Sequence, residues 1–501
     1  MAAVALVLVS GGSDTDPRTP AALPGMPPPF LGTAVTGRGG FTAAVDAYGD
    51  VVDLRPSPAG PALIDNPADR QATGTVPADT GIVPRVSVDG GPALPFWRAD
   101  SVSQRYLPGT SVVRTVARFG DVEAVVTVAA GGSSLAVAMS AEAPPGTRVR
   151  RSVGVDTEDR RGWHLCLRGC AGLIRNVARN DRRWLSRARQ LGDAPAWARA
   201  MYARSLLTLR ALTDRRTGAV AAGARDGWAY VWPRDAATAA LAFAAAGYRG
   251  EAHRVAHFLL GLDSGAAARF QGDGAPVPGR GPQGDAAGWI AVAAQAAQEP
   301  APTEPSPRRN LPDYQEGVPG DYLANALAAT AVPTDPQSRR QRAVRDIARS
   351  FGTPAGLVRR SGDPGSGLDS SAAWAVRPFA APRLYPAARR SLLRLSAGQT
   401  RFGIVPSERW GGGGDPWTAP TAWTAWAFAG LRNPELDIAQ AAADRRQALR
   451  LLADLRRAAT PAGAIPERVD ARTGLPGSTT PLAWPHAFAI LALRELWPGR
   501  F

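Results

Sequence analysis

Two patterns of hydrophobic and polar positions divide the chain near residue 190. Between residues 31 and 185, short Val- and Thr-rich runs alternate with clusters of Gly, Pro and Asp, which is typical of β-strands joined by tight turns. The clearest runs, Ser111–Phe119 and Val122–Ala129, flank Gly120-Asp121 and predict a β-hairpin. The recurrence of such runs predicts an N-terminal β-sandwich over residues 31–190.

From residue 191 to residue 501, Ala-, Leu- and Arg-rich stretches of helix length alternate with loops rich in Gly, Pro and Trp. Several stretches are apolar on every side, as expected for helices that pack on more than one face. The predicted helices are 194–212, 234–247, 250–262, 285–298, 319–331, 337–351, 367–379, 383–396, 418–431, 441–456 and 480–496. This number favours two concentric rings of helices, an (α/α)6 barrel; a solenoid would also fit, but no motif repeats at a fixed period. The predicted fold class is mainly α, a barrel preceded by a β-sandwich.

Residues 1–30 are predicted to be a truncated, signal-like segment followed by a linker. Met1–Ser10 is an apolar run without the basic residues that precede a signal-peptide core, and it is too short to span a bilayer. We therefore expect an exported protein, extracellular or in the cell envelope, while a frayed N-terminus and a cytoplasmic location stay open. No other segment is long and apolar enough for a stable membrane span.

The charge of the chain does not predict a nucleic-acid partner. It has 58 basic and 43 acidic residues, a formal net charge of +15, and every basic residue is arginine. These arginines are spread along the chain without a basic helix or an aromatic–basic block, so we expect no nucleic-acid binding. The absence of lysine excludes a Walker A phosphate loop, a Schiff-base lysine and a Ser-Lys dyad.

We predict no cofactor and no metal in the functional site. Cys166 and Cys170 are too few for a Cys-rich zinc or iron–sulfur centre, and they either pair or remain free thiols. His253 and His257 have the spacing of metal ligands on a helix, but no HExxH motif accompanies them, which favours an ordinary helix surface. There is no dinucleotide fingerprint; a structural calcium ion stays open.

Tryptophans gather in the loops that lead into predicted helices, beside arginines and carboxylates. A tryptophan ring covers the apolar C–H face of a pyranose, while Arg and Asp exchange hydrogen bonds with its hydroxyls, so this grouping predicts a sugar site. The groups are Trp228, Tyr230 and Trp232 before Arg234-Asp235; Trp410 and Trp417 around Gly411–Gly414 and Asp415; and Trp484 before His486.

Two glutamates, Glu316 and Glu467, lie in Gly- and Pro-bearing loops just before predicted helices. Hydrolysis of a glycosidic bond needs two carboxyl groups, one protonated and one ionised, on either side of the scissile bond. Either glutamate alone would be an ordinary solvated loop residue. Together with the tryptophan loops they are candidates for an acid and a base.

Five segments, in order along residues 200–495, resemble motifs of glycoside hydrolase family 15, the glucoamylase-like enzymes. They are Gly227–Asp235 (GWAYVWPRD), similar to the W-x-RD motif; Gln283–Asp285, similar to Q-x-D; Asp313–Gly320, similar to the D-x-W-E-x-x-x-G loop; Gly411–Trp417 (GGGGDPW), similar to the G-G/N-N-P-W turn; and Glu467 with Pro481–Ala487, similar to E-Q…P-L-x-W-S-H-A.

The resemblance implies an inverting, exo-acting hydrolase of α-glucosides or related oligosaccharides. Glu316 would protonate the glycosidic oxygen and Glu467 would activate a water on the opposite face of the ring, with the carboxyls about 6.5–9.5 Å apart. Arg234 and Asp235 would hold the terminal sugar. The other implied substrate-binding residues are Trp232, Asp285, Trp410, Trp417, Trp484, His486 and one of Arg401 and Arg409.

Four positions depart from the family's usual residues: Gln315 replaces Trp, Arg468 replaces Gln, Asp415 replaces Asn and Pro485 replaces Ser. They leave the two carboxylates in place but make the sugar, the linkage and the preferred chain length open. A trehalase-type enzyme or a hydrolase of a non-glucose envelope glycan is an alternative. So are a non-catalytic carbohydrate-binding envelope protein, against which the presence of both Glu316 and Glu467 argues, and a phosphorylase, against which Glu467 in the base position argues.

Overall fold

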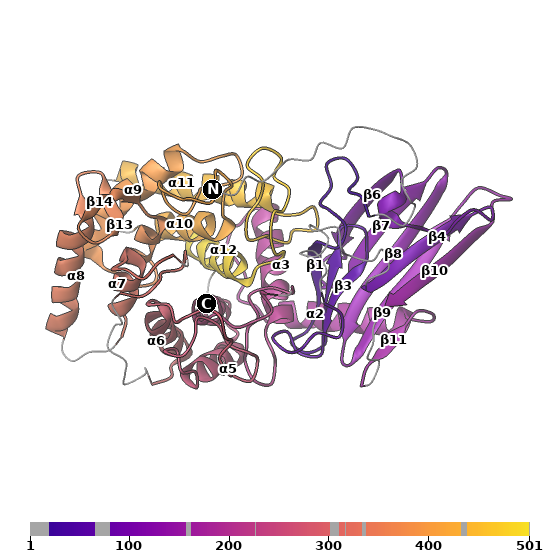
Figure 1. The fold of residues 1–501 in the computed structure, drawn as a ribbon, viewed down its shortest axis with the longest axis horizontal. Coiled ribbons are helices and arrows are strands. Elements are labelled where there is room, and N and C mark those ends of the chain that lie inside the picture. The colour runs from indigo at the N-terminus through magenta and orange to yellow at the C-terminus, as the bar shows by residue number, and fades with distance from the viewer. Residues whose placement is uncertain are drawn as a thin grey trace.

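The computed structural model describes residues 20–65, 81–156, 162–225, 227–300, 310–315, 317–332, 337–431 and 438–499. Strands make up the N-terminal part of the molecule and helices almost all of the rest (Figure 1). The two parts lie side by side, with α2 (Ala171–Leu185) and α3 (Ala196–Leu212) where they meet.

Two sheets form the N-terminal domain. The first has the order β1-β2-β3-β4-β10, with β5 paired to β4; its strands are Gly32–Gly37, Thr42–Asp46, Val51–Arg55, Gly81–Val88 and Val149–Asp156, and β5 is Leu94–Pro95. The second has the order β11-β9-β8-β7-β6, with strands His164–Cys166, Ser134–Glu142, Val122–Gly131, Val113–Phe119 and Ser101–Tyr106. A short 3₁₀ helix, η1 (Phe96–Arg98), precedes β6.

The predicted hairpin is confirmed. Phe119 of β7 pairs with Val122 of β8, and Gly120 has a φ of +56°, the left-handed conformation that a two-residue turn requires. Inward-facing residues of both sheets, such as Val45 and Val126, belong to one buried cluster, so the two sheets enclose a common core.

Helix α2 was not predicted from the sequence. This helix lies inside the range interpreted as strand-like, and it packs along β8 through Val177 and Ala178. Just before it, Cys166 and Cys170 form a disulfide with their Cα atoms 5.7 Å apart, so of the two alternatives they pair.

Ten of the predicted helices are present, with boundaries shifted by a few residues. They are α3, α4 (Pro233–Ala245), α5 (Arg249–Leu260), α6 (Ala286–Ala297), α7 (Leu323–Ala329), α8 (Gln337–Phe351), α9 (Tyr385–Ala397), α10 (Thr418–Gly430), α11 (Ile438–Ala458) and α12 (Ala483–Leu496).

The helix predicted at 367–379 is wrong in type. The chain forms a small sheet of β12 (Gly352–Thr353), β13 (Gly356–Arg360) and β14 (Asp363–Leu368), followed by a six-residue 3₁₀ helix, η2 (Ser370–Ala375). The Asp369 side chain accepts a hydrogen bond from the backbone N–H of Ser371, which starts η2 as a tight turn. A second 3₁₀ turn, η3 (Pro382–Leu384), leads into α9.

Helices α4, α10 and α12 are buried along nearly their whole length, which explains their all-round apolar composition. Outer helices with one polar face cover them: α5 packs against α4, and α11 packs against α10. Loops that precede the buried helices therefore meet at one end of the helical domain, where a site can form.

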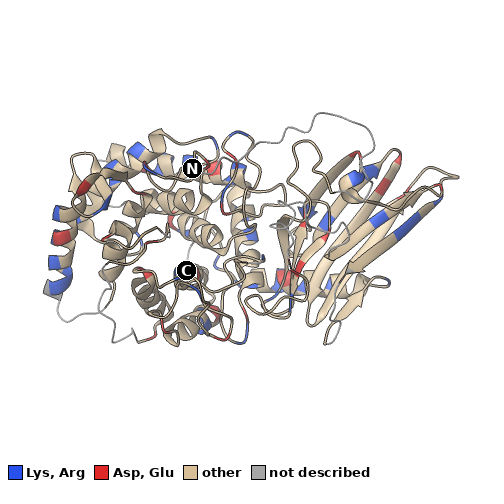
Figure 2. Ribbon diagram, viewed as in Figure 1, with Lys and Arg blue, Asp and Glu red and all other residues tan. Residues whose placement is uncertain are grey.

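Arginines are spread over both domains rather than confined to one stripe (Figure 2). Among the described residues, none of the helices is both long and apolar enough to cross a membrane.

Candidate active site

One cavity, of about 280 Å³, collects side chains from four of the five resembling segments. The loop before α4, the segment before α7, the residue before α10 and the loop before α12 all contribute to it. Its lining residues are Ala222, Gly227, Trp228, Trp232, Arg234, Asp235, Arg280, Tyr314, Gln315, Trp417, Glu467, Arg468, Ser478, Leu482 and Trp484.

The start of α4 fixes Arg234 and Asp235 in this cavity. Trp232 is the residue before the helix, and Pro233 occupies the first helical position, where its missing N–H costs nothing. Arg234 Nη1 donates to Gln283 Oε1 at 2.8 Å and to Asp285 Oδ2 at 2.9 Å. Asp285 does not line the cavity itself; its hydrogen bond orients the Arg234 guanidinium, which does.

The charges around Arg234 make Asp235 unusual. Burial raises the pKa of Asp235 to about 7; Arg234 opposes the shift, and Glu467 and Asp285 add to it. Burial alone would lower the pKa of Arg234, but Asp285 and Asp235 raise it above its ordinary value. Arg234 therefore stays charged, whereas Asp235 exchanges a proton near neutral pH.

Glu467 is held in place by its backbone and by two side chains. Its N–H donates to the Thr479 carbonyl at 3.0 Å, and its own carbonyl accepts from the Thr418 N–H at 3.0 Å. Trp228 Nε1 donates to Oε1 at 3.3 Å, and Ser478 Oγ donates to Oε2. A carboxylate that accepts bonds on both oxygens while facing a cavity is oriented for proton transfer.

His486 lies beneath the Glu467 loop and does not line the cavity. It is fully buried; the Ile465 N–H donates to Nε2 at 3.0 Å, and Nδ1 lies 2.9 Å from Ser205 Oγ. Burial lowers the pKa of His486 to about 3, and Arg204 adds to this lowering. The imidazole is therefore neutral, and both ring nitrogens bond to protein rather than to a sugar.

Glu316, the predicted general acid, lies outside the described residues. The three residues before it are well anchored: Arg359 makes a bidentate pair with Asp313, with contacts of 2.8 and 3.0 Å. Gln315 lines the cavity, and its Nε2 donates to Asp369 Oδ2 at 2.6 Å. The chain thus reaches the cavity at the residue before Glu316.

The other predicted residues divide into two groups. Trp417 and Trp484 line the cavity, and Trp484 lies under the Arg234 guanidinium, 4.6 Å from its Cζ. Trp410 does not line it; its ring packs edge-on against Trp417 at 5.2 Å. Arg401 and Arg409 are both exposed and lie outside the lining.

Several lining residues were not predicted as site residues. Arg280 and Arg468 supply the cavity's arginines besides Arg234. The sequence did point to Arg468, because this residue replaces the usual Gln beside Glu467. Arg280 follows a Gly/Pro-rich loop that contains no motif by which it could have been predicted. Trp228 belongs to the predicted aromatic group but has no predicted role. Asp369 does not line the cavity but holds Gln315, and it has no sequence signal.

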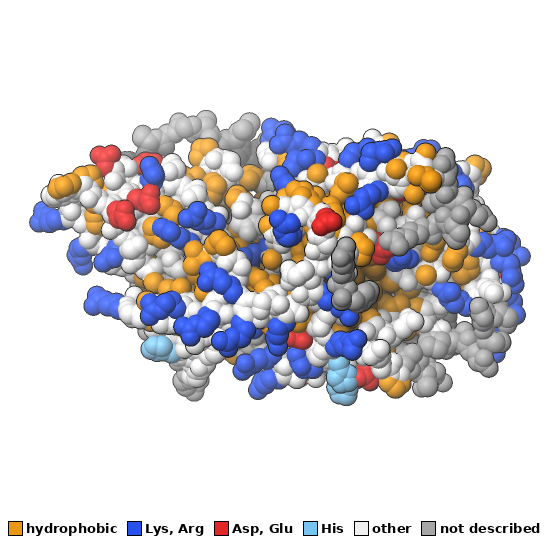
Figure 3. Space-filling view, turned by 180° about the vertical axis from the view of Figure 1, so that it is seen from behind, with side chains coloured by type: hydrophobic (Ala, Val, Ile, Leu, Met, Phe, Trp, Pro, Cys, Tyr) orange, Lys and Arg blue, Asp and Glu red, His pale blue; other side chains and the backbone are white. Residues whose placement is uncertain are grey.

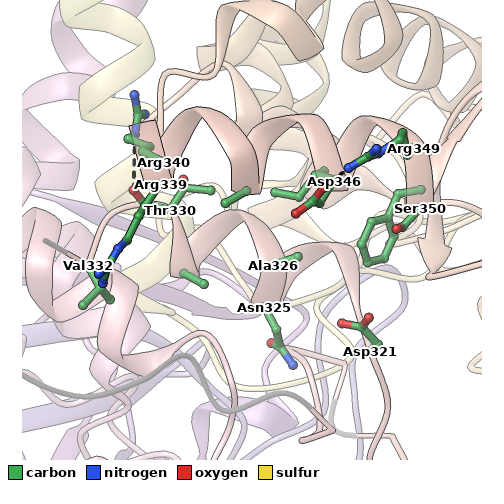
Figure 4. A pocket seen from close by; sticks show the side chains of 14 residues that line it. Asp321, Asn325, Ala326, Thr330, Val332, Arg339, Arg340, Asp346, Arg349 and Ser350 are labelled. Carbon is green, nitrogen blue, oxygen red and sulfur yellow. Dashed lines mark hydrogen bonds and ion pairs between the residues drawn. The ribbon is translucent and has the colours of Figure 1, made fainter. Parts of the chain in front are cut away.

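A larger cavity, of about 560 Å³, lies between α7 and α8 and has a different character (Figure 4). Three of its five charged side chains have local partners: Arg349 pairs with Asp346, and Arg340 donates to the Thr330 carbonyl. No tryptophan lines it, so it lacks the stacking surface of a sugar site.

Metal-binding groups do not gather in the part of the chain that is described. No set of three His, Cys, Asp or Glu side chains there is arranged to hold an ion. His253 pairs with Glu299, and its ring lies 6.2 Å from that of His257 on the outer surface of α5.

Sequence comparison links one segment of the chain to a known family. Residues 196–264, which span α3 to α5 and include Trp232, Arg234 and Asp235, match the family model of glycosyl hydrolases family 15. A search of curated proteins finds no match to the sequence.

Structure comparison covers almost the whole chain. A bacterial glucoamylase in complex with acarbose aligns over 97% of this chain and 96% of its own, with a TM-score of 0.66 and 14% identity. A glucoamylase from Saccharomycopsis fibuligera is a weaker match, with 60% and 94% of the two chains covered, a TM-score of 0.48 and 13% identity. The chain therefore has a glucoamylase-like fold, and with the family segment this supports a glycoside hydrolase.

Proposed function

We propose that this chain, which has a glucoamylase-like fold and a segment matching glycosyl hydrolases family 15, is an inverting, exo-acting glycoside hydrolase of α-glucosides. The observation that carries the proposal is the cavity in which Glu467 lies with Arg234, Asp235, Trp417 and Trp484. These residues come from loops and from the first turns of helices, and they are separated by up to 250 positions along the chain.

Glu467 is the proposed general base. In the reaction it takes a proton from a water molecule as the water oxygen bonds to the anomeric carbon of the sugar. Glu316 is the proposed general acid, and it gives its proton to the glycosidic oxygen as the bond from that oxygen to the anomeric carbon breaks. Arg234 and Asp235 hold hydroxyls of the terminal sugar, and Trp232, Trp417 and Trp484 cover its apolar face.

The size of the cavity supports exo action. About 280 Å³ lies just below the range of about 300–1,000 Å³ that drug-sized ligands occupy, which suits one terminal sugar better than a long chain. We further propose that the helical domain is an (α/α)6 barrel, because buried helices such as α4 and α10 are each covered by an outer amphipathic helix.

Proton NMR of the anomeric signals tests the reaction. The protein is incubated with maltooligosaccharides, isomaltooligosaccharides and trehalose, and β-glucose is expected to appear first from at least one of them. Glu316→Gln and Glu467→Gln should each lower kcat by about 10²–10⁴-fold, because each removes a proton-transfer group. The matched control is Glu142→Gln, an exposed change at the end of β9.

Three results would contradict the proposal. Release of α-glucose first would exclude inversion, and full activity in Glu467→Gln would exclude its role as the base. Binding of these sugars without any release would favour the non-catalytic carbohydrate-binding protein.

We propose that the protein acts outside the cytoplasm. The disulfide between Cys166 and Cys170 supports this location, because disulfides persist mainly in oxidising compartments. Alkylation of unreduced protein from the source cells should label neither cysteine, whereas labelling of both would argue for a reducing compartment.

A further inference from the structure

A second cavity, of about 230 Å³, lies where the two domains meet and shares no lining residue with the candidate active site. The turn between β1 and β2 forms one wall. The others come from the end of α2 and the segment after it, from α3 and the loop after it, and from α4 and α5. Five arginines line it: Arg38, Arg187, Arg210, Arg215 and Arg254. On the face of the molecule drawn in Figure 3, basic side chains gather along the lower edge, near the centre of the view.

The acidic groups near this cavity are already engaged. Glu251, its one lining carboxylate, accepts a hydrogen bond from Trp184 Nε1 at 3.1 Å. Asp181 pairs with Arg210 at 3.0 Å and also accepts from the backbone and hydroxyl of Ser111.

In the described part of the chain the remaining four arginines of the cavity form no ion pair, although Arg38 is close enough to Asp181 to oppose the rise that burial causes in the pKa of that carboxyl. These four are Arg38, Arg187, Arg215 and Arg254. Arg210 is half-buried, and burial followed by repulsion from Arg38 and Arg187 lowers its pKa to about 10, although Asp181 opposes the shift. The cavity therefore concentrates positive charge that an anion would offset.

The backbone around these arginines is tightly docked. Gly39 has a φ of +72°, and a Cβ on it would lie 2.4 Å from the Thr213 carbonyl oxygen, so only glycine allows this approach. The Arg215 N–H donates to the Gly39 carbonyl at 2.8 Å. The turn that carries Arg38 of the β domain is thus docked directly against Arg215 of the helical domain before any ligand binds.

We propose that this junction cavity binds a phosphate group, free or on a small metabolite, and that the bound anion links the two domains. Guanidinium groups match phosphate oxygens with paired hydrogen bonds, and several arginines around one cavity favour an anion with several oxygens. The cavity is smaller than the range for drug-sized ligands, which fits a compact anion. The proposal does not depend on the hydrolase activity.

Calorimetric titration of the full chain with inorganic phosphate, with glucose 6-phosphate and with glucose tests the site. Both phosphates should bind in a way that Arg254→Gln weakens, whereas any binding of glucose at the proposed active site should be unaffected by that change. Tighter Arg254-dependent binding of glucose 6-phosphate would identify a sugar phosphate as the source, and equal Arg254-dependent binding would identify the free anion. Arg254→Gln should weaken phosphate binding by about tenfold or more, because a charge-assisted hydrogen bond is lost. The control Arg249→Gln changes an exposed arginine at the start of the same helix, outside the cavity, and should bind as wild type does.

Arg215→Gln provides a second variant on a loop, for the case that Arg254→Gln fails to fold. Phosphate should also raise the melting temperature of the wild type in proportion to its binding, and this rise should shrink in both cavity variants. Absence of binding in the wild type at millimolar phosphate would overturn the proposal. Equal weakening in Arg249→Gln and Arg254→Gln would overturn the assignment to this cavity.

Discussion

Asp235 ionises in a site that already holds negative charge. Arg234 contacts Asp285 at 2.9 Å but lies 3.9 Å from Asp235, so its charge is shared unequally between the two carboxylates. The pKa of Asp235 is about 7 in the folded state, against an ordinary value of 3.8. Between these two pH values the native state therefore binds more protons than the unfolded state does. The contribution of Asp235 to stability is therefore greatest below pH 4 and is lost as the pH rises through 7.

Asp235→Asn should remove this pH dependence. The amide does not ionise, so the melting temperature of the variant should fall less than that of wild type between pH ~4.5 and ~8. Its kcat/KM should drop by about 100-fold, as expected when a charged hydrogen bond to the sugar is lost. Thermal unfolding followed across this pH range provides the measurement, and parallel curves for the two proteins would contradict the shifted pKa.

The residues of the candidate site differ in how well the sequence predicts them. Arg234 and Asp235 directly follow Trp232-Pro233, and a proline at this place predicts that a helix begins there, with both residues in its first turn. The placement of Arg401 and Arg409 depends on how a loop returns to the cavity, and spacing along the chain does not encode that. Arg280 illustrates the same difficulty, because it reaches the cavity from a long loop without regular pattern.

At the scale of elements, strongly patterned segments were predictable and mixed ones were not. The all-apolar stretches of α4, α10 and α12 correspond to buried helices. In contrast, α2 packs one apolar stripe on β8 and is otherwise rich in Arg and Asn, so it was obscured by the strands before it. The segment 367–379 has helix-like composition, but the Asp369 cap and Pro378 favour a short 3₁₀ turn instead.

The loop that carries Glu467 depends on a helix-borne side chain beneath it. His486 in the first turn of α12 accepts from the Ile465 N–H, two residues before the proposed base. His486→Ala should lower the free energy of unfolding by about 1–3 kcal/mol, because a buried N–H loses its acceptor. It should also lower kcat more than it changes KM.

Denaturant unfolding and steady-state kinetics measure the two effects of His486→Ala. The control is His257→Ala, a change at an exposed position of α5 that should leave both unaltered. A variant that lost stability but kept full kcat would show that the histidine supports the fold without orienting the base.

At the scale of the whole molecule, one arginine connects the domains. Arg204 of α3 donates through Nη2 to the Thr110 carbonyl at 2.7 Å, and its Cζ lies 3.3 Å from the centre of the Tyr106 ring. Thr42 of β2 adds a bond to the Ala211 carbonyl at 3.0 Å. Because these contacts are buried, we expect the two domains to unfold together.

Arg204→Met should separate the two unfolding events. The substitution keeps the apolar stem but removes the hydrogen bond and the cation–π contact, which together contribute about 2–4 kcal/mol. Calorimetry should then show two transitions in place of one. Arg199→Met, at an exposed position of the same helix, is the control, and a single transition in both variants would mean that other contacts suffice to couple the domains.

The loops that form the cavity end where buried helices begin, and this arrangement separates two kinds of evolutionary change. A substitution at a loop position of the cavity, such as Arg468 beside the proposed base, changes the cavity lining without disturbing helix packing. A substitution inside α10 or α12 affects the core and is removed by selection whatever the substrate. On this scaffold a few short segments can therefore change the lining of the cavity while the packing of the buried helices beneath them stays the same.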